Sequence, residues 1–398
     1  MYLLKNKNIF FGILLSGIFL LLCLPNSLKQ ILTLDFFDLT FLIFSIIYIP
    51  FFIKTIINFK TNKVYVLIYI YIALCFITSF VANDFILQRF FIGILFFLPF
   101  FIISDIRWDK EKLIILKYVA LFTFFFLSMQ VVLASLGIMK FNNTEVQEVG
   151  AFNRVGTTAG VATFTAPVII TLFGILNILY KSRLVKFTLL SVTLVSVFLS
   201  GTRSALLVIV FSLFLNLILV IKLKYKLFLI LFTIILIPIA DSKFKIYETL
   251  EARNQNAKDY SDGDVTSGRV KRWMYIYDKI DENPEILLTG IGGGNAPYFN
   301  KYLKTKLQAT SSPHNVYLAV LYEHGFIILF VFFGILFLLT KKALRKIHLS
   351  SLIFIFTLLI TFNTEVFPLG SGFSSLFFLL YFLLINDKKI NFLLKKNA

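Results

Sequence analysis

The chain has 398 residues, of which 58% are hydrophobic and 17% aromatic, and its mean hydropathy is +0.86. This composition excludes an ordinary soluble globular protein and is typical of membrane proteins, in which apolar stretches of about 20 residues recur. The formal net charge of +18 would suit a nucleic-acid-binding protein, so the positions of the charges have to decide between the two classes.

Apolar stretches of membrane-spanning length recur along most of the chain. They predict an all-α polytopic integral membrane protein with about twelve transmembrane helices. The first stretch follows Lys5 and Lys7 and resembles a signal peptide, but no small-residue cleavage site follows it, so we interpret it as a retained span. The predicted spans are 9–24, 34–53, 64–82, 85–103, 113–139, 158–179, 185–200, 203–221, 226–240, 314–339, 349–366 and 369–385.

Of the 39 basic residues, 22 occupy loops on one side of these spans. Positively charged loops face the cytoplasm, so both termini are predicted to be cytoplasmic. The charge then meets anionic lipid headgroups, which makes membrane lipids the expected partners and argues against nucleic acid. The residues are Lys5 and Lys7; Lys54, Lys60 and Lys63; Arg107, Lys110 and Lys112; Lys181, Arg183 and Lys186; Lys222, Lys224 and Lys226; Lys341, Lys342, Arg345 and Lys346; and Lys388, Lys389, Lys395 and Lys396.

One long polar segment lies between predicted spans nine and ten, on the outer side. It carries eleven Lys or Arg and ten Asp or Glu residues, and a loop of this length in a membrane protein usually carries function. We therefore divide the chain into residues 1–240 with nine transmembrane helices, a large periplasmic or extracellular loop at 241–313 with a short amphipathic helix, and residues 314–398 with three more transmembrane helices.

The first candidate site residue is an arginine at the start of a predicted span. Arg203 lies in Ser200-Gly-Thr-Arg-Ser-Ala205, just inside the outer face, where an arginine needs a partner. Guanidinium groups bind phosphate oxygens through a planar fork, so this position predicts an anionic ligand. The alternative is a snorkelling side chain that anchors the helix end.

Two more arginines, Arg269 and Arg272, open an amphipathic helix in the outer loop, which Asn283-Pro284 ends. They predict a basic surface for a diphosphate at the membrane face. The alternative is a helix that lies on anionic lipid. The apolar stripe of this helix is predicted to contain Trp273, Ile276, Tyr277 and Ile280.

A glycine tract, Thr289-Gly-Ile-Gly-Gly-Gly-Asn295, follows that helix. Glycines such as Gly292 and Gly293 let the backbone approach a ligand and form anion-binding nests. The tract lacks the Lys-Ser/Thr of a P-loop, so nucleotide binding is not predicted. A plain flexible turn is the alternative interpretation.

His314 is the strongest single candidate, because an imidazole at the first turn of a span suits proton transfer near neutral pH. A structural histidine is the alternative. Asn315 follows it, Glu365 lies on the same side between the last two spans, and Arg154 lies in a second outer segment; we predict all three to bind substrate. His324, in Glu323-His-Gly325, is interpreted as helix packing.

No metal or cofactor site is predicted. Cys23 and Cys75 both lie in predicted spans and form no metal-binding or disulfide pattern. Asp262-Gly-Asp264 resembles the Asp-x-Asp of metal-dependent glycosyltransferases, but it is short and lies on the side of the membrane that has no nucleotide sugars.

Taken together, these motifs resemble the O-antigen ligase/polymerase superfamily. The resemblance rests on the order of Ser-Gly-Thr-Arg-Ser, Gly-Arg-x-x-x-Trp, Asn-Pro, Gly-Ile-Gly-Gly-Gly, Pro-His-Asn and the stretch from Tyr317 to Gly325. It covers about residues 185–340, is only topological over the first half of the chain and is weak over the last two spans. The chain departs from the family in its dense glycines and in Leu287-Leu288-Thr289, where Leu-Phe-Gly is common.

The resemblance implies a glycosyltransferase of the bacterial inner membrane that uses undecaprenyl-diphosphate-linked glycans as donor and acceptor at the outer face of that membrane. It implies that Arg203 and Arg269 hold the donor diphosphate and that His314 activates the acceptor hydroxyl. A flippase and a chain-length regulator are the further partners that it implies. With fixed guanidinium groups in place of a metal, we expect metal-independent transfer with inversion at the anomeric carbon.

Several functions stay open at this point. We favour a polymerase of repeat units (Wzy type) over a ligase that transfers O-antigen to lipid A-core (WaaL type). A flippase or transporter would more often carry charges at the bilayer midplane. A non-catalytic assembly protein would more often carry a coiled coil, and no heptad pattern occurs.

Overall fold

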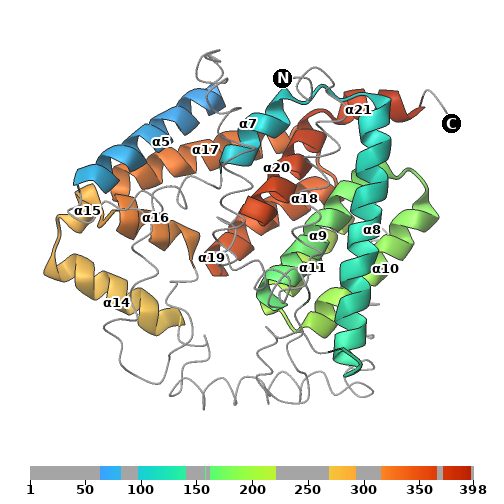
Figure 1. The fold of residues 1–398 in the computed structure, drawn as a ribbon, viewed down its shortest axis with the longest axis horizontal. Helices are drawn as coiled ribbons and strands as arrows, with labels where there is room; N and C mark the ends of the chain where they lie inside the picture. The colour runs from blue at the N-terminus through green and yellow to red at the C-terminus, as the bar shows by residue number, and fades with distance from the viewer. Residues whose placement is uncertain are drawn as a thin grey trace, which may run out of the picture.

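The computed structural model describes residues 63–81, 97–139, 157, 162–220, 269–292, 315–364 and 371–395. The elements in these ranges are helices, which agrees with the predicted all-α fold (Figure 1). The predicted spans 9–24, 34–53 and 226–240 lie outside the described residues. The count of about twelve spans and the bounds of the outer loop therefore stay predictions.

Four described helices are long and apolar enough to cross a membrane: α5 (Lys63–Val81), α8 (Lys110–Ser135), α10 (Arg183–Ser200) and α17 (Phe326–Ala343). Together they support a membrane protein. Shorter apolar helices lie beside them. The remaining helices are α7 (Leu98–Asp105), α9 (Ala162–Leu179), α11 (Arg203–Val220), α14 (Arg269–Glu282), α15 (Ile286–Thr289), α16 (Val316–His324), α18 (Leu349–Phe356), the π-helical turn η2 (Thr357–Thr361), α19 (Phe362–Thr364), α20 (Ser371–Ile385) and α21 (Asp387–Lys395).

Polar caps set several helix ends. Asp109 accepts a hydrogen bond from the Lys112 N–H and starts α8, as an N-cap aspartate should. Gly201 ends α10 in the left-handed conformation, with φ of 69°, which glycine adopts without strain. Such local signals explain why the predicted bounds 185–200 and 203–221 lie close to those of α10 and α11.

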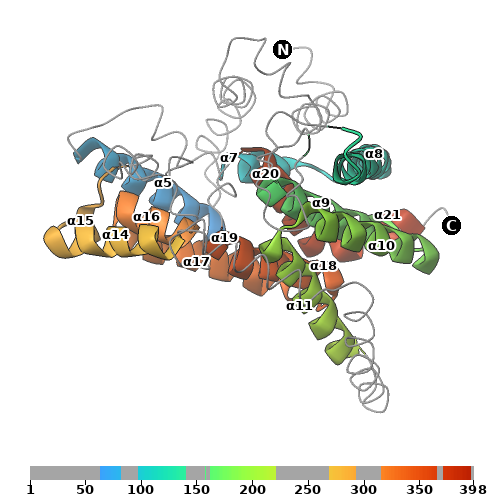
Figure 2. The ribbon, with the colours of Figure 1, turned by 90° about the horizontal axis from the view of Figure 1, so that it is seen from below.

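The core of the bundle is apolar and rich in aromatic rings. α9 packs on α8, α10, α18 and α20, while α5 packs along α17 (Figures 1 and 2). The ring of Phe97 joins these groups of helices: its centroid lies 5.2 Å from that of Tyr71 in α5 and 6.2 Å from that of Phe378 in α20. Since lipid is as apolar as leucine, the shape and close packing of these side chains hold the bundle together.

The structure differs from the prediction in the span 314–339, which is two helices. α16 ends at His324, Gly325 adopts φ of 81°, and α17 starts at Phe326. The rings of Tyr317 and Phe333 stack with centroids 5.2 Å apart, although 16 residues of continuous helix would separate them by about 24 Å. α16 therefore folds back along α17, and hydropathy missed the break because both helices are apolar.

Candidate functional site

The glycine tract of the outer loop is bonded to the end of α16. The Ile291 N–H donates to the Tyr322 carbonyl over 3.0 Å, and the Gly292 N–H donates to the Glu323 carbonyl over 2.9 Å. Gly292 is buried, with φ of 92°. The described part of the tract thus attaches α14 and α15 to the membrane helices, and we name this contact the α15–α16 joint. The predicted role of Gly292 in substrate binding stays a prediction.

Two glycines make the close approach at this joint possible. A Cβ atom on Gly290 would lie 2.2 Å from the Glu323 carbonyl oxygen, and one on Gly325 would lie 2.5 Å from the Leu288 carbonyl oxygen. Both glycines also have positive φ, of 68° and 81°. Because backbone atoms occupy the space on each side, no larger residue fits at either position without moving a helix.

The apolar face of α14 packs against α16. Ile276 is fully buried and forms a cluster with Ala319 and Tyr322, and Ile280 packs at its edge. Tyr277, which the sequence places in the same stripe, is 54% exposed. The protein itself covers most of this stripe, which sequence periodicity alone cannot distinguish from a stripe that lies on lipid.

The direction of α14 brings its predicted site residues toward the start of α16. Ile276 packs beside Ala319, whereas Gly290, which follows α14 and α15, meets Glu323 at the end of α16. The two helices therefore run in the same direction (Figure 1). Arg269 and Arg272 lie in the first turn of α14, at the end of that helix nearer Asn315.

Asn315 caps α16 with its side chain. The Oδ1 atom accepts hydrogen bonds from the Tyr317 N–H over 3.0 Å and the Leu318 N–H over 3.1 Å, and the residue is 7% exposed. The Tyr317 hydroxyl donates to the Leu358 carbonyl in η2 over 2.8 Å. The start of α16 is thus fixed against a π-helical turn, an element that is often found at functional sites.

Arg203 is the first residue of α11 and is half-buried. Its neighbours Ser200, Thr202 and Ser204 are buried, so its surroundings are small and polar, as the sequence predicts. α11 packs on α18 and η2, while α16 packs on α19, which follows η2 directly. The helices that start at Arg203 and after Asn315 therefore meet the same stretch of chain, residues 349–364.

Four predicted site residues, His314, Arg154, Gly293 and Glu365, lie outside the described residues, and their roles stay predictions. Within the described ranges, no group of three His, Cys, Asp or Glu side chains could hold a metal ion. Sequence reasoning missed the joint. Its only signal was a glycine at each partner, Gly290 in the tract and Gly325 after His324.

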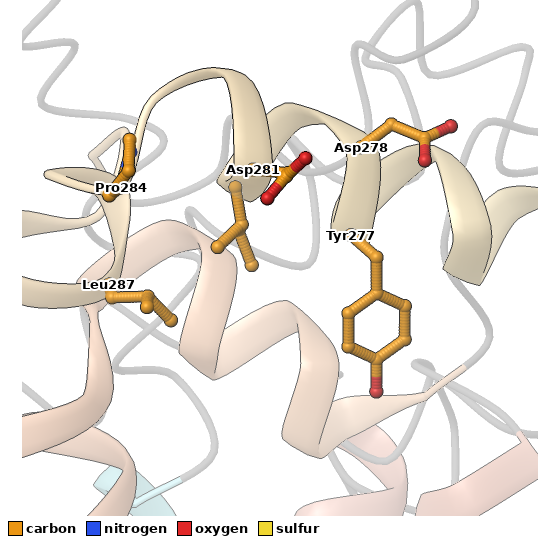
Figure 3. Close-up of a pocket in the computed structure, with 6 residues that line it drawn as sticks. Tyr277, Asp278, Asp281, Pro284 and Leu287 are labelled. Carbon is orange, nitrogen blue, oxygen red and sulfur yellow. The ribbon is translucent and has the colours of Figure 1, made fainter.

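An open groove of about 410 Å³ lies on α14 and α15. Figure 3 shows Pro284 and Leu287 at one end, Tyr277 at the other and Asp281 between them. No predicted site residue is among the residues that line this groove. Its lining residues are Tyr277, Asp278, Ile280, Asp281, Pro284 and Leu287.

The comparison with known families bears on this arrangement. Residues 187–333 match the family Wzy_C, O-Antigen ligase. The matched segment runs from α10 into α17 and contains Arg203, Arg269, Arg272, Gly292 and Asn315. No curated protein matches the chain. The predicted resemblance to the O-antigen ligase/polymerase superfamily is confirmed over this segment, and with the apolar helices it supports a membrane enzyme of the ligase or polymerase type.

Proposed function

We propose that this protein polymerises undecaprenyl-diphosphate-linked oligosaccharide repeat units at the outer face of the bacterial cytoplasmic membrane. The match of residues 187–333 to the O-antigen ligase family carries this proposal, because that segment includes the arginine motifs, the glycine tract and the Pro-His-Asn motif. The placement of Arg203 at the start of α11 and of Arg269 in the first turn of α14 supports an anionic donor.

The chemistry follows from the donor. A lipid-linked sugar already carries a diphosphate leaving group, so catalysis requires stabilisation of the charge that develops on that group. Arg203 and Arg269 supply positive charge, and the N-terminal ends of their helices add partial positive charge. His314 takes the proton of the attacking hydroxyl. In-line attack inverts the anomeric carbon and needs no metal ion.

The second candidate is ligation of finished O-antigen to lipid A-core. The family description, O-Antigen ligase, favours it. Polymerase and ligase share a donor and differ in the acceptor, which is a second lipid-linked glycan for the polymerase and lipid A-core for the ligase. The two reactions therefore use the same arginines and the same base, and only the products distinguish them.

Surface glycans from a strain that lacks the gene, run on a gel beside extracted lipid-linked intermediates, test the proposal. A polymerase deletion leaves single repeat units on the acceptor and removes long chains. Long chains that remain on undecaprenyl diphosphate above bare lipid A-core would establish the ligase. An unchanged pattern would refute both the polymerase and the ligase function and would favour a transporter.

Variants of the predicted site residues test the mechanism. We expect His314→Ala to lower the rate of transfer about 100-fold or more, because it removes the base. Arg269→Ala should mainly raise the donor concentration needed for half-maximal rate. Full activity of His314→Ala, or unchanged donor saturation in Arg269→Ala, would contradict the assigned roles. Lys279→Ala, a change in the last turn of α14, is the matched control for the loss of a positive charge.

A further inference from the structure

An exposed apolar surface surrounds Gly325, where the end of α5, the start of α17 and the short helix α15 meet (Figure 1). At the start of α17, Phe326 and Phe330 are exposed, and their ring centroids lie 4.6 Å apart. On α15, Leu287 and Leu288 are exposed, Leu288 to 63%. Exposed apolar patches of this kind mark contacts with a membrane or with another protein.

On α5 and α17 the partner of this surface is lipid. The exposed phenylalanines of α17 stand four, three and four residues apart between Phe326 and Phe337, so they share one side of the helix. α5 has an exposed apolar side that includes Ile77 and Phe80. Both helices are long and apolar enough to cross a membrane. In a membrane, such sides face the acyl chains.

α15 lies beside the point where the lipid-facing side of α17 begins. A Cβ atom on Gly325 would lie 2.5 Å from the Leu288 carbonyl oxygen, and Gly325 directly precedes Phe326. The 18 residues of α17 span about 27 Å, close to the thickness of the hydrocarbon core. Lys341 and Lys342 mark the other end of that helix. α15 therefore lies at the edge of the hydrocarbon core, opposite the lysines.

The backbone of α15 and of the residues after it is suited to an apolar environment. Each backbone N–H from Ile286 to Gly292 donates to a carbonyl over 2.9 to 3.0 Å. The Thr289 hydroxyl donates to the Glu285 carbonyl over 3.1 Å. No charged residue occurs between positions 286 and 292. Unpaired backbone groups are what keep loops out of lipid, and these N–H groups are all paired.

We propose that α15 inserts into lipid at this end of α17 and anchors the α14–α15 segment to the membrane. Leu287 and Leu288 lie among the lipid chains, while the exposed carboxylates of Asp281 and Glu285 stay in water. Sequence periodicity allows a lipid contact for α14, but α16 covers much of the apolar face of that helix. The lipid contact therefore falls on α15.

The anchor is a positioning element for α14. α15 follows α14 after three residues, and the segment is attached to α16 at Ile276 and at Gly292. An inserted α15 holds the end of α14 at the membrane and restricts how far α14 can turn or lift. Arg269, in the first turn of α14, is thereby kept near the headgroups, where a lipid-linked diphosphate lies; this last step rests on the proposed function.

A spin label on Leu288→Cys tests the insertion without use of activity. The full-length protein is placed in lipid nanodiscs, where oxygen concentrates in the lipid chains and a charged nickel complex stays in water. We expect the ratio of oxygen to nickel collisions for Leu288→Cys to match that of Phe330→Cys on α17. It should exceed that of Asp278→Cys, an exposed position on α14, several-fold. Wild type, labelled in the same way, gives the blank for Cys23 and Cys75.

Two results would overturn the insertion. A Leu288→Cys label with the collision ratio of Asp278→Cys would place α15 in water. A label that is shielded from both oxygen and nickel would place α15 under protein, such as a second copy of this chain.

Glutamine substitutions on α15 test the anchor. Leu287→Gln combined with Leu288→Gln removes lipid contact equal to about one leucine side chain, so we expect the α14 amides to exchange hydrogen about 10-fold faster in nanodiscs. Met274→Gln, at an exposed position of α14, is the matched control and should keep exchange within about 2-fold of wild type. Unchanged exchange in the double variant would contradict the anchor.

Transfer activity separates the anchor from the proposed function. The double glutamine variant should need several-fold more donor for half-maximal rate at a nearly unchanged maximal rate, because the anchor affects donor binding. Unchanged donor saturation would contradict the positioning of Arg269. If no variant, wild type included, shows transferase activity, the proposed function fails, and the collision and exchange results still decide the insertion of α15.

Discussion

The membrane bundle and the α15–α16 joint are held together by different parts of the chain. In the bundle, side chains meet side chains, as in the ring contacts of Tyr71, Phe97 and Phe332. At the joint, backbone meets backbone, with the Gly290 and Gly325 positions pressed against carbonyl groups. Side chains can change rotamer, but a peptide group cannot move without its helix, so we expect the two regions to respond differently to the same substitution.

Glycine to alanine changes should show this difference most clearly. Gly290→Ala places a methyl group 2.2 Å from the Glu323 carbonyl oxygen at φ of 68°, so α15 must leave α16. We expect the free energy that holds α15 against α16 to fall by about 4 kcal/mol or more. Rapid proteolysis between α14 and α16, together with loss of transfer, would show this. The magnitude reflects both the clash and the cost of a left-handed alanine.

Gly174→Ala is the matched change in the bundle. A Cβ atom there would meet the flexible end of the Leu380 side chain at 3.2 Å and the Ile353 side chain at 3.6 Å, which is ordinary van der Waals contact. The gain in helix propensity, about 1 kcal/mol, opposes that crowding. We expect the Tm to change by only a few degrees. Equal damage from Gly174→Ala and Gly290→Ala would contradict the proposed difference between the two regions.

The contact of α14 with α16 should be the next most sensitive feature. Ile276→Ala removes a fully buried side chain and should weaken the docking of α14 by about 2 to 4 kcal/mol. Met274→Ala, on the same helix at 54% exposure, should change it by less than about 0.5 kcal/mol. Hydrogen exchange of the α14 amides measures both. If the two variants exchange alike, α14 rests on lipid rather than on α16.

The sequence predicts the bundle better than the joint for a physical reason. Hydropathy and caps locate α10 and α11 to within a few residues, because these signals are local. Gly290 and Gly325 are 35 positions apart, and a glycine tract looks the same whether it faces a phosphate or another backbone. The return of α16 along α17 was likewise hidden, since an apolar helix that folds back has the same hydropathy as one that continues.

The candidate site was likewise only partly predictable from the sequence. Sequence reasoning selected Arg203 and Asn315, which the structure places at the starts of two helices that meet residues 349–364. It interpreted His324 only as helix packing, because nothing in the sequence shows that the Thr78 hydroxyl oxygen on α5 lies 3.2 Å from its Nδ1 atom. Residues far apart in sequence define the chemistry of such a side chain, and a single sequence does not carry those distances.

Substitutions of Asn315 can separate its cap from its predicted role in substrate binding. Asn315→Ala should lower the free energy of unfolding by about 1 kcal/mol, because two N–H groups of α16 lose their acceptor. Asn315→Ser restores a capping oxygen and should restore the Tm. If Asn315 also binds substrate, the serine variant stays impaired in transfer at normal stability. Full transfer activity in Asn315→Ser would restrict Asn315 to the cap.

The smallest predicted effect lies at the start of α18, where a histidine caps the helix. The Nδ1 atom of His348 accepts a hydrogen bond from the Ser351 N–H over 3.3 Å, which only an unprotonated nitrogen can do. Burial lowers the pKa of His348 from its ordinary value, and nearby Lys346 and Lys186 lower it further against the opposing charge of Asp387. The folded state therefore prefers the neutral ring.

The sign of the pH effect follows from that preference. Stabilisation by the cap is fully present above about pH 6.5 and is lost as the pH falls below it, since the unfolded chain then binds a proton that the folded chain resists. His348→Asn keeps a capping side chain that does not titrate in this range. We expect wild type to lose about 0.5 to 1 kcal/mol relative to His348→Asn between pH 7.5 and pH 5, measured by Tm. A wild type that gains stability relative to that variant on acidification would mean that Asp387, rather than the cap, governs the proton on His348.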